Sequence, residues 1–491
     1  MNYSPVMDAS IFLPDLRERR ERAYRAFIGV VDSWILAHDV DRDADADLLA
    51  LAEQEIIGEA MRQIYRVMTG GPERTHRMAY LQKVPAPSKL WKQSARFGLS
   101  LLGLRTNYRP PILFRPDRDI CAFHRSALTV AYAEQKNVDP CLMTHGDWFG
   151  RATAAVNRGS SFSAEVEHML VTAMRNAFKA AELNDEIVIE QSVSRFSEYA
   201  RWIDFHRTAL SNSARRLPKM FWAGTMGFPL HRIFARAVMR LGGEVVGFDH
   251  GSGSGMHDWD FQVRTEFGMV NRFVTFSTSM AEGLRRNTER CGRRFSNVKI
   301  EALSAPRKEK ITSFDSKSNI KILYVSRSNS GENFISPPLD TSNFLRDWQW
   351  RVLGALKTTG MEVGFKPHPE DTNTHVTHFR DALGVEIHTG KLEEFDWTNT
   401  VFVFDTTLSS TFPYALATGL PIILFDTPHV AVSPEARKML VQRVAMAPVW
   451  RDPEGRLQAD LTYMPELFES AVSKRGNNSV LQNYYGVETS L

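Results

Sequence analysis

The feature that most constrains this chain is a repeated alternation of short apolar strands with helical segments from residue 220 onward. Residues 220–223 form an apolar run that leads into a glycine-containing turn over 224–227. A helix is predicted over 229–241, two glycines stop it, and a strand follows over 244–248. A strand, helix, strand unit with short connections is typical of a parallel sheet covered by helices.

The alternation continues in two blocks. The first block goes on with a strand over 272–277, a helix over 279–291 and an extended segment over 298–303. The second block is predicted to alternate strands over 320–325, 362–366, 385–388, 401–404 and 421–425 with helices over 344–358, 374–383 and 410–417. The polar, lysine-rich residues 304–318 between the blocks have no apolar period, which is typical of a linker. Each block therefore predicts a doubly wound, Rossmann-like α/β domain.

The N-terminal part of the chain has a helical pattern instead. Apolar residues recur at three and four positions between about residues 15 and 68, and this spacing returns over 160–214. Three prolines around a short apolar run over 108–116 interrupt the helical regime. We therefore divide the chain into a helical region, residues 1–110, a first Rossmann-like domain, residues 111–303, and a second one, residues 319–491.

Charge and cysteine content narrow the class of protein. With 60 Lys and Arg against 57 Asp and Glu, the net charge of +3 does not suggest a nucleic-acid-binding protein. Cys121, Cys141 and Cys291 are far apart and odd in number, so no disulfide framework is predicted. No signal-peptide pattern and no apolar run of roughly 18 residues occurs, and we expect a cytoplasmic protein. Basic stretches over 17–25 and 285–294 are either solvated helix faces or places of peripheral contact with anionic lipid at the inner membrane face.

In an open α/β sheet, ligands bind beyond the carboxyl ends of the strands, so the loops there are the candidate sites. Asp249 and His250 follow the predicted strand over 244–248 and precede a glycine-rich turn. Glycines let the backbone approach a ligand closely, and either side chain can move a proton. The alternative is a plain glycine-rich connection with a surface Asp and His.

Two loops of the second block carry cations. Lys366 and His368 stand in a Lys-Pro-His-Pro segment, where the prolines restrict the backbone and present both side chains to phosphate oxygens. Ser326 and Arg327 follow the first strand of the block, and an arginine can grip a phosphate or a sugar carboxylate with two parallel hydrogen bonds. An ordinary X-Pro turn and a solvent-facing loop are the respective alternatives.

A third loop of the second block is rich in hydroxyl groups. Ser409, Ser410 and Thr411 stand where a strand gives way to a helix. Their hydroxyls, together with the free amides of a helix start, can bind an anion. Simple N-capping, which needs one hydroxyl, is the alternative.

Other site types are disfavoured by spacing. The turn over 224–227 lacks the GxGxxG spacing of a dinucleotide site, and no GxxxxGK[ST] phosphate loop occurs. His250, His257, Asp258 and His368 show no spacing that places two metal ligands on one helix face. The sequence therefore predicts no metal and no tightly bound cofactor.

The order of these loops resembles a set of bacterial GT-B glycosyltransferases for surface carbohydrates. These are the Kdo and related nonulosonic acid transferases of capsule and lipopolysaccharide and, more distantly, the polyol-phosphate polymerases of teichoic acid synthesis. The resemblance spans roughly residues 221–426 and rests on GTMG with VVGFDHGSG, on KPHP, and on DTTLSST followed by ATGLP. It implies a GT-B fold with two Rossmann-like domains facing a cleft, the first for the acceptor and the second for a nucleotide sugar.

The resemblance also implies roles for individual residues. Lys366, His368 and the hydroxyl residues 409–411 take the part that holds the nucleotide phosphate. Arg327 and Lys366 would bind a CMP-activated acidic sugar without a metal, and the acceptor would be a glycan or lipid-linked glycan. Many relatives carry glutamine where this chain has Asp249, which could be a general base in an inverting transfer or a nucleophile in a retaining one. A CDP-polyol phosphotransferase and a non-catalytic nucleotide- or carbohydrate-binding module stay open as alternatives.

Overall fold

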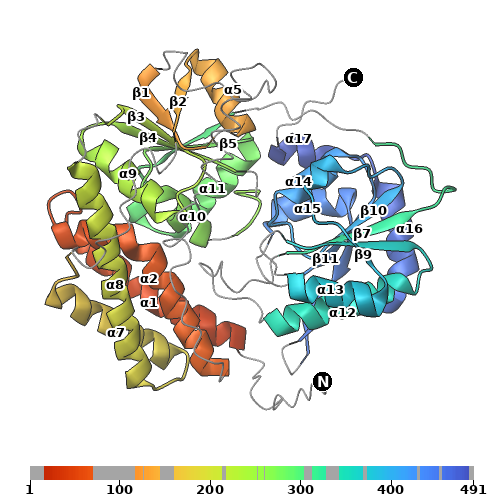
Figure 1. Ribbon diagram of the computed structural model, residues 1–491, viewed down its shortest axis with the longest axis horizontal. Coiled ribbons are helices and arrows are strands. Elements are labelled where there is room, and N and C mark those ends of the chain that lie inside the picture. Colours follow the sequence, from red (N-terminus) through yellow and green to blue (C-terminus); the bar gives the residue numbers. More distant parts are fainter. Residues whose placement is uncertain are drawn as a thin grey trace.

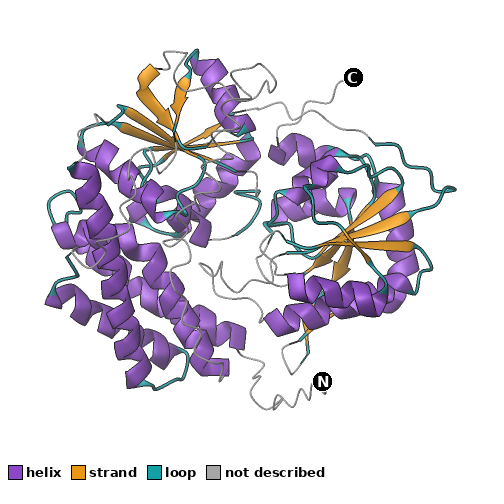
Figure 2. Ribbon diagram, viewed as in Figure 1, coloured by secondary structure: helices purple, strands orange, loops and turns teal. Residues whose placement is uncertain are grey.

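The computed structural model describes residues 16–69, 117–124, 126–143, 160–212, 217–250, 253–258, 260–303, 312–327, 342–368, 373–427, 432–452 and 456–485. Figure 1 shows two α/β lobes, each built around one sheet, with a group of long helices packed beside the first lobe. Figure 2 shows that helices flank both sheets.

The first lobe contains a six-stranded parallel sheet with the strand order β2-β1-β3-β4-β5-β6. Its strands are β1 (Asp117–Ala122), β2 (Pro140–Leu142), β3 (Met220–Ala223), β4 (Glu244–Phe248), β5 (Arg272–Thr275) and β6 (Lys299–Ala302). Its helices are α5 (Ala127–Lys136), α9 (Pro229–Arg240), α10 (Asp260–Phe267) and α11 (Thr278–Arg290), with a 3-10 turn η3 (Arg293–Phe295). The strands β4 and β5 are apolar and buried, as expected where helices cover both faces of a parallel sheet.

The second lobe contains another six-stranded parallel sheet, in the order β12-β11-β10-β7-β8-β9. Its strands are β7 (Lys321–Val325), β8 (Glu362–Lys366), β9 (Glu386–Ile387), β10 (Thr400–Phe404), β11 (Ile422–Asp426) and β12 (Ala445–Pro448), and an antiparallel pair β13 (Trp450–Arg451) and β14 (Leu457–Gln458) follows. The chain starts in the centre of this sheet, moves to one edge and then to the other, which is the Rossmann strand order. Its topological switch point lies between β7 and β10.

The helices of the second lobe complete its layers. They are α12 (Ser342–Lys357), α13 (Asn373–Leu383), α14 (Thr411–Ala417), α15 (Pro434–Arg443), α16 (Met464–Lys474) and α17 (Ser479–Tyr485), with 3-10 turns η4 (Leu392–Glu394) and η5 (Leu461–Tyr463). The predicted α/β class with two Rossmann-like domains is therefore confirmed, and the arrangement is GT-B-like.

Four long helices lie beside the first sheet and share an apolar core with it (Figure 1). They are α1 (Leu16–Ala37), α2 (Ala44–Thr69), α7 (Ala164–Ala180) and α8 (Glu186–Ser211), and α1 packs on α7 while α2 packs on α8. A network of buried ion pairs joins these helices to the sheet domain. Asp47 on α2 is fully buried between Arg207, Arg236 and Arg240, and Arg232 on α9 pairs with Glu55.

The two lobes share one apolar core. Phe248 and Met256 of the first lobe and Phe404, Leu440 and Tyr485 of the second belong to the same buried cluster. Helix α17 contributes to this cluster and packs against α11 of the first lobe as well as α14 and α15 of the second. The lobes are therefore joined by buried side chains in addition to the connecting chain.

Most predicted elements are confirmed within one or two residues. The strands over 244–248 and 362–366 have the predicted bounds, and the helix predicted over 229–241 is observed over Pro229–Arg240. The strand predicted over 272–277 ends earlier, at Thr275, because the hydroxyl of Ser277 accepts the N–H of Met280 and caps α11. The apolar run over 112–114 lies outside the described residues, and the proposed domain boundaries stay predictions.

The two basic stretches make many contacts within the chain. Arg19 donates to the carbonyl of Ala181, and Arg22 pairs with Glu182. Arg294 is nearly buried and pairs with Glu53. These contacts give no support for a lipid-binding face. In the described part of the chain, no helix combines the length and the apolar character that crossing a membrane requires.

Candidate functional site

The carboxyl ends of three adjacent strands bring together the candidate residues of the second lobe. Val325 at the end of β7 is paired in register with Lys366 at the end of β8 and with Phe404 at the end of β10. The N–H of Ser326 donates to the carbonyl of Lys366 at 3.0 Å, so the pairing continues beyond the last residue of β7. These strand ends lie at the switch point of the sheet, where open α/β sheets bind ligands.

Lys366 is the most informative residue at this edge. The residue as a whole is 4% exposed, and within the described residues its ammonium makes no hydrogen bond or ion pair. Burial lowers the pKa of Lys366, and the negative charge of Glu393 opposes this shift. A buried ammonium is costly unless an anion or other acceptors compensate it. The strand end therefore favours the binding of an anionic group.

A buried carboxylate stands beside the arginine of this edge. Asp405 follows β10, is fully buried, and accepts the hydroxyl of Tyr324 at 2.8 Å. The Nε atom of Arg327 lies 3.9 Å from the same carboxylate oxygen. Burial raises the pKa of Asp405, against the opposing effects of Arg327 and Tyr324. Asp405 thus restrains Arg327 near the switch point, a contact that the sequence pattern did not indicate.

The remaining candidates of the second lobe lie next to these strand ends. Ser326 is buried and accepts the side-chain N–H of Gln349 at 3.0 Å, while His368 is half-buried two residues beyond Lys366. Ser409 and Thr411 share a hydrogen between their hydroxyls at 2.5 Å. Ser410 lies between them, is exposed, and makes no side-chain capping bond to α14. Its hydroxyl is therefore not used as a helix cap.

The two catalytic candidates of the first lobe differ in exposure. Asp249 follows β4 and is fully buried, and its carboxylate accepts the hydroxyl of Thr275 at 3.2 Å. His250 is exposed. Of the pair, only the imidazole of His250 is exposed to solvent.

A third ionisable group, Glu266 on α10, lies close enough to this pair for their charges to affect its pKa. It is 3% exposed, and its two carboxylate oxygens accept the hydroxyl of Thr225 at 2.7 Å and the N–H of Met226 at 2.9 Å. Burial raises the pKa of Glu266, while the charge of His250 opposes the rise and that of Asp249 adds to it. Glu266 therefore holds the turn after β3 through two hydrogen bonds, and its pKa responds to the charges of His250 and Asp249. Sequence reasoning missed this residue.

One signal in the sequence could have identified Glu266. The glutamate stands three positions after Val263 and one before Phe267, both of which are buried in α10. Residues three apart lie on the same face of a helix. An ionisable side chain on a buried helix face needs polar partners, which here are in the turn after β3.

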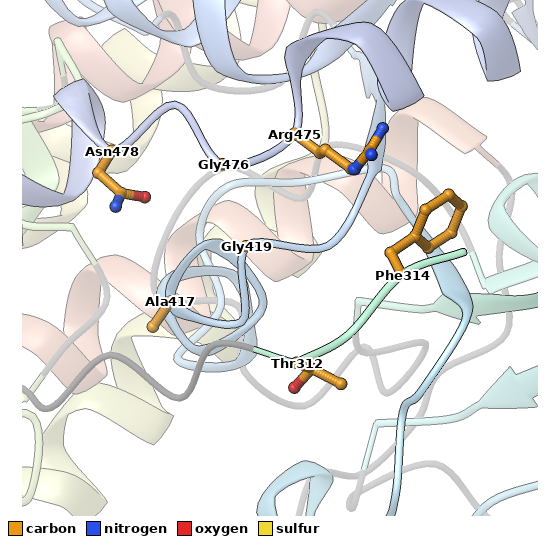
Figure 3. A pocket seen from close by; sticks show the side chains of 7 residues that line it. All are labelled: Thr312, Phe314, Ala417, Gly419, Arg475, Gly476 and Asn478. Atoms are coloured by element: carbon orange, nitrogen blue, oxygen red, sulfur yellow. The ribbon is translucent and has the colours of Figure 1, made fainter. Parts of the chain in front are cut away.

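A cavity lies at the other edge of the second sheet (Figure 3). It is lined by Thr312, Phe314, Ala417, Gly419, Arg475, Gly476 and Asn478. Residues 417 and 419 precede β11, whereas the candidate residues follow their strands. This cavity is therefore separate from the candidate site.

Metal ligands do not gather at the candidate site. In the described ranges, no three His, Cys, Asp or Glu side chains lie close enough together to hold a metal ion. His257, considered above for its sequence position, instead binds Thr407 of the second lobe, with 2.6 Å between Nε2 and Oγ1.

Comparison with known proteins gives little further information. No protein-family model matches the chain, and no curated protein matches it. Among solved structures, the chain is similar to a UDP complex of MnaA from S. aureus, with 9% identity and a TM-score of 0.40, covering 75% of this chain and 92% of that one. It is also similar to a protein assigned as UDP-N-acetylglucosamine 2-epimerase from Listeria monocytogenes, with 11% identity and a TM-score of 0.34, covering 75% of this chain and 84% of that one. Likeness at this level carries no argument about substrate or reaction.

Proposed function

We propose that the protein is a metal-independent glycosyltransferase whose donor is a nucleotide-activated sugar, specifically a CMP-activated acidic sugar of the Kdo or nonulosonic acid type. The observation that carries this proposal is Lys366, a largely buried lysine at the switch point of a Rossmann-type sheet whose ammonium has no hydrogen-bond or ion-pair partner among the described residues. An anion is the complementary partner for such a group, and the phosphate of a nucleotide sugar is an anion of the right kind.

The surrounding residues support a donor with two negative groups. Lys366, His368 and the hydroxyl residues 409–411 would bind the single phosphate of the CMP moiety. Arg327, restrained by Asp405, would bind the sugar carboxylate through two parallel hydrogen bonds. Cationic and hydroxyl partners of this number stabilise the departing phosphate without a metal.

In the proposed reaction, the acceptor hydroxyl oxygen forms a bond to the anomeric carbon while the bond from that carbon to the phosphate oxygen breaks. CMP leaves with the bonding electron pair, and the hydroxyl proton moves to the enzyme. Because His250 is exposed and Asp249 is buried, we assign the proton transfer to His250 and the stabilisation of the positive imidazolium to Asp249. The acceptor is proposed to be a surface glycan or its lipid-linked precursor.

The proposal is tested by incubating the protein with a CMP-activated acidic sugar or a CDP-polyol, each with a glycan acceptor. The expected result is release of CMP from the CMP-sugar alone, with a new glycosidic linkage in the acceptor. Release of CMP only from the CDP-polyol, with phosphate in the product, would establish a phosphotransferase instead. Nucleotide binding without turnover of either donor would indicate a binding module.

Roles within the first lobe are tested by Asp249→Asn and His250→Asn. Both changes are expected to reduce turnover by about 100-fold or more, because general acid–base catalysis contributes 10²–10⁴-fold. CMP affinity, which depends on the second lobe, should stay within about twofold of the parent value. Unchanged turnover in either variant would remove that residue from the mechanism.

A further inference from the structure

A short loop of the first lobe makes direct contacts with the second. Residues 253–257 follow β4, and His257 forms an isolated antiparallel bridge with Val432. The N–H of Ser433 donates to the carbonyl of Met256 at 2.8 Å. The side chain of His257 continues across the interface to Thr407, with 2.6 Å between Nε2 and Oγ1.

The same loop is tightly held by its own lobe. Gly255 has a φ of +84° and packs so closely on α11 that an added Cβ would lie 2.2 Å from the carbonyl oxygen of Met280. The side-chain amide of Asn287 donates to the carbonyl of His257 at 2.8 Å. These contacts hold the backbone around His257 against α11 of the first lobe.

The contact between His257 and Thr407 is shielded from water. His257 is 1% exposed and Thr407 is 5% exposed. Burial lowers the pKa of His257 to about 4, so its ring is neutral at neutral pH and shares one hydrogen with the threonine hydroxyl. Hydrogen bonds excluded from water hold a fixed geometry better than exposed ones.

Thr407 lies in the loop of the second lobe that is proposed to bind the donor phosphate. Thr407 lies between Asp405, which restrains Arg327, and Ser409, which begins the hydroxyl-rich start of α14. His257 lies shortly after the proposed proton-transfer pair, Asp249 and His250, in the sequence. One buried hydrogen bond therefore joins the loop proposed to bind the phosphate to the residues that follow the proposed proton-transfer pair.

We propose that His257 is a positioning residue that fixes the loop 405–411 against residues 253–257 of the first lobe, so that a bound donor faces the proton-transfer pair. His257 itself touches neither substrate. This inference rests on the proposed function for its kinetic consequence, whereas the coupling of the two loops does not depend on it. A residue that only stabilised the interface would lower the melting temperature and leave turnover by the folded enzyme unchanged.

The kinetic test uses Thr407→Val, His257→Leu, the double variant and the conservative His257→Gln. Thr288→Val is the matched control, because Thr288 is also buried and its hydroxyl donates to the carbonyl of Leu284 within α11. Thr407→Val and His257→Leu are each expected to lower kcat by on the order of 10- to 100-fold, since a small misplacement of reacting groups has effects of that size. CMP affinity should stay within about twofold of the parent value, and the double variant should lose no more than a single one.

His257→Gln should recover most of the lost turnover, because its amide can reach the threonine hydroxyl. Turnover of folded Thr407→Val equal to that of Thr288→Val would overturn the proposal. Multiplying losses in the double variant would overturn it as well, because they would show that the two residues act independently.

A second measurement separates this inference from the proposed function. Amide hydrogen exchange in the ligand-free full-length protein should become at least about tenfold faster in residues 253–258 and 405–411 of Thr407→Val, and in neither segment of Thr288→Val. If exchange in both segments is faster in Thr407→Val but the parent protein turns over no CMP-sugar, the structural coupling of the two loops stands and the donor assignment is rejected. Unchanged exchange in both segments would reject the coupling, whatever the substrate proves to be.

Discussion

Acidification should weaken the folded chain through His257, and the structure gives the direction and the size of the effect. Burial lowers the pKa of His257 to about 4, whereas an exposed histidine has a pKa of about 6.5. Between these two values the unfolded chain binds a proton at this position and the folded chain does not. The free energy of unfolding therefore rises with pH in this window and falls as the pH decreases from about 6.5 towards 4.

The magnitude follows from the difference between the two pKa values. Each unit corresponds to about 1.4 kcal/mol, so the full loss through His257 is about 3 kcal/mol at and below the folded-state pKa. Between pH 7 and pH 5, the same pKa values predict a loss of about 2 kcal/mol. A loss of this size is a large fraction of the stability of a typical domain.

The assay is urea unfolding of the parent protein and of His257→Gln at pH 7, 6 and 5. Replacement by Gln removes the titrating group. Between pH 7 and pH 5, the free energy of unfolding of this variant should therefore fall by about 2 kcal/mol less than that of the parent. His168→Gln is the control, because His168 is exposed on α7, and its pH dependence should match that of the parent. Equal pH dependence of His257→Gln and the parent would refute the reasoning, since His257 would then not be held neutral by burial.

Two further predictions concern buried carboxylates. Asp47→Ala should lower the free energy of unfolding by about 3–5 kcal/mol in urea melts, because it removes the buried carboxylate that Arg207, Arg236 and Arg240 share. The control Glu21→Ala removes an exposed ion pair and should cost less than about 0.5 kcal/mol; similar effects of both changes would contradict the role of Asp47. Glu266→Ala should destabilise by about 1–3 kcal/mol because the N–H of Met226 loses its acceptor, whereas Glu266→Gln retains an acceptor oxygen and should cost less. Equal destabilisation by Ala and Gln would argue against that hydrogen bond.

The fold was predictable from the sequence where local pattern determines structure. The strands Glu244–Phe248 and Glu362–Lys366 are short apolar runs bounded by glycine or polar residues, so their bounds could be read directly. The amphipathic spacing over 160–214 predicts helices but not their partners. The packing of α7 and α8 on α1 and α2 depends on contacts between distant parts of the chain, which periodicity does not encode.

The candidate site was predictable to a similar extent. The rule that ligands bind beyond the carboxyl ends of parallel strands correctly grouped Arg327 and Lys366 at one sheet edge. It could not predict that Asp405 lies beside Arg327, because two strands that are distant in sequence are adjacent at the switch point. The contact of His257 with Thr407 is also long-range, and no spacing in the sequence indicates it.

The most direct test of the central claim is the dissociation constant of CMP, measured by isothermal titration calorimetry, for the parent protein, Lys366→Met and Lys321→Met. Lys321 is an exposed lysine at the opposite end of β7 and serves as the matched control. Loss of one charge-assisted contact of about 1.5–3 kcal/mol predicts affinity that is roughly 10- to 150-fold weaker in Lys366→Met and unchanged in Lys321→Met. Parent-like CMP affinity in Lys366→Met, or equal losses in both variants, would contradict a phosphate site at this sheet edge.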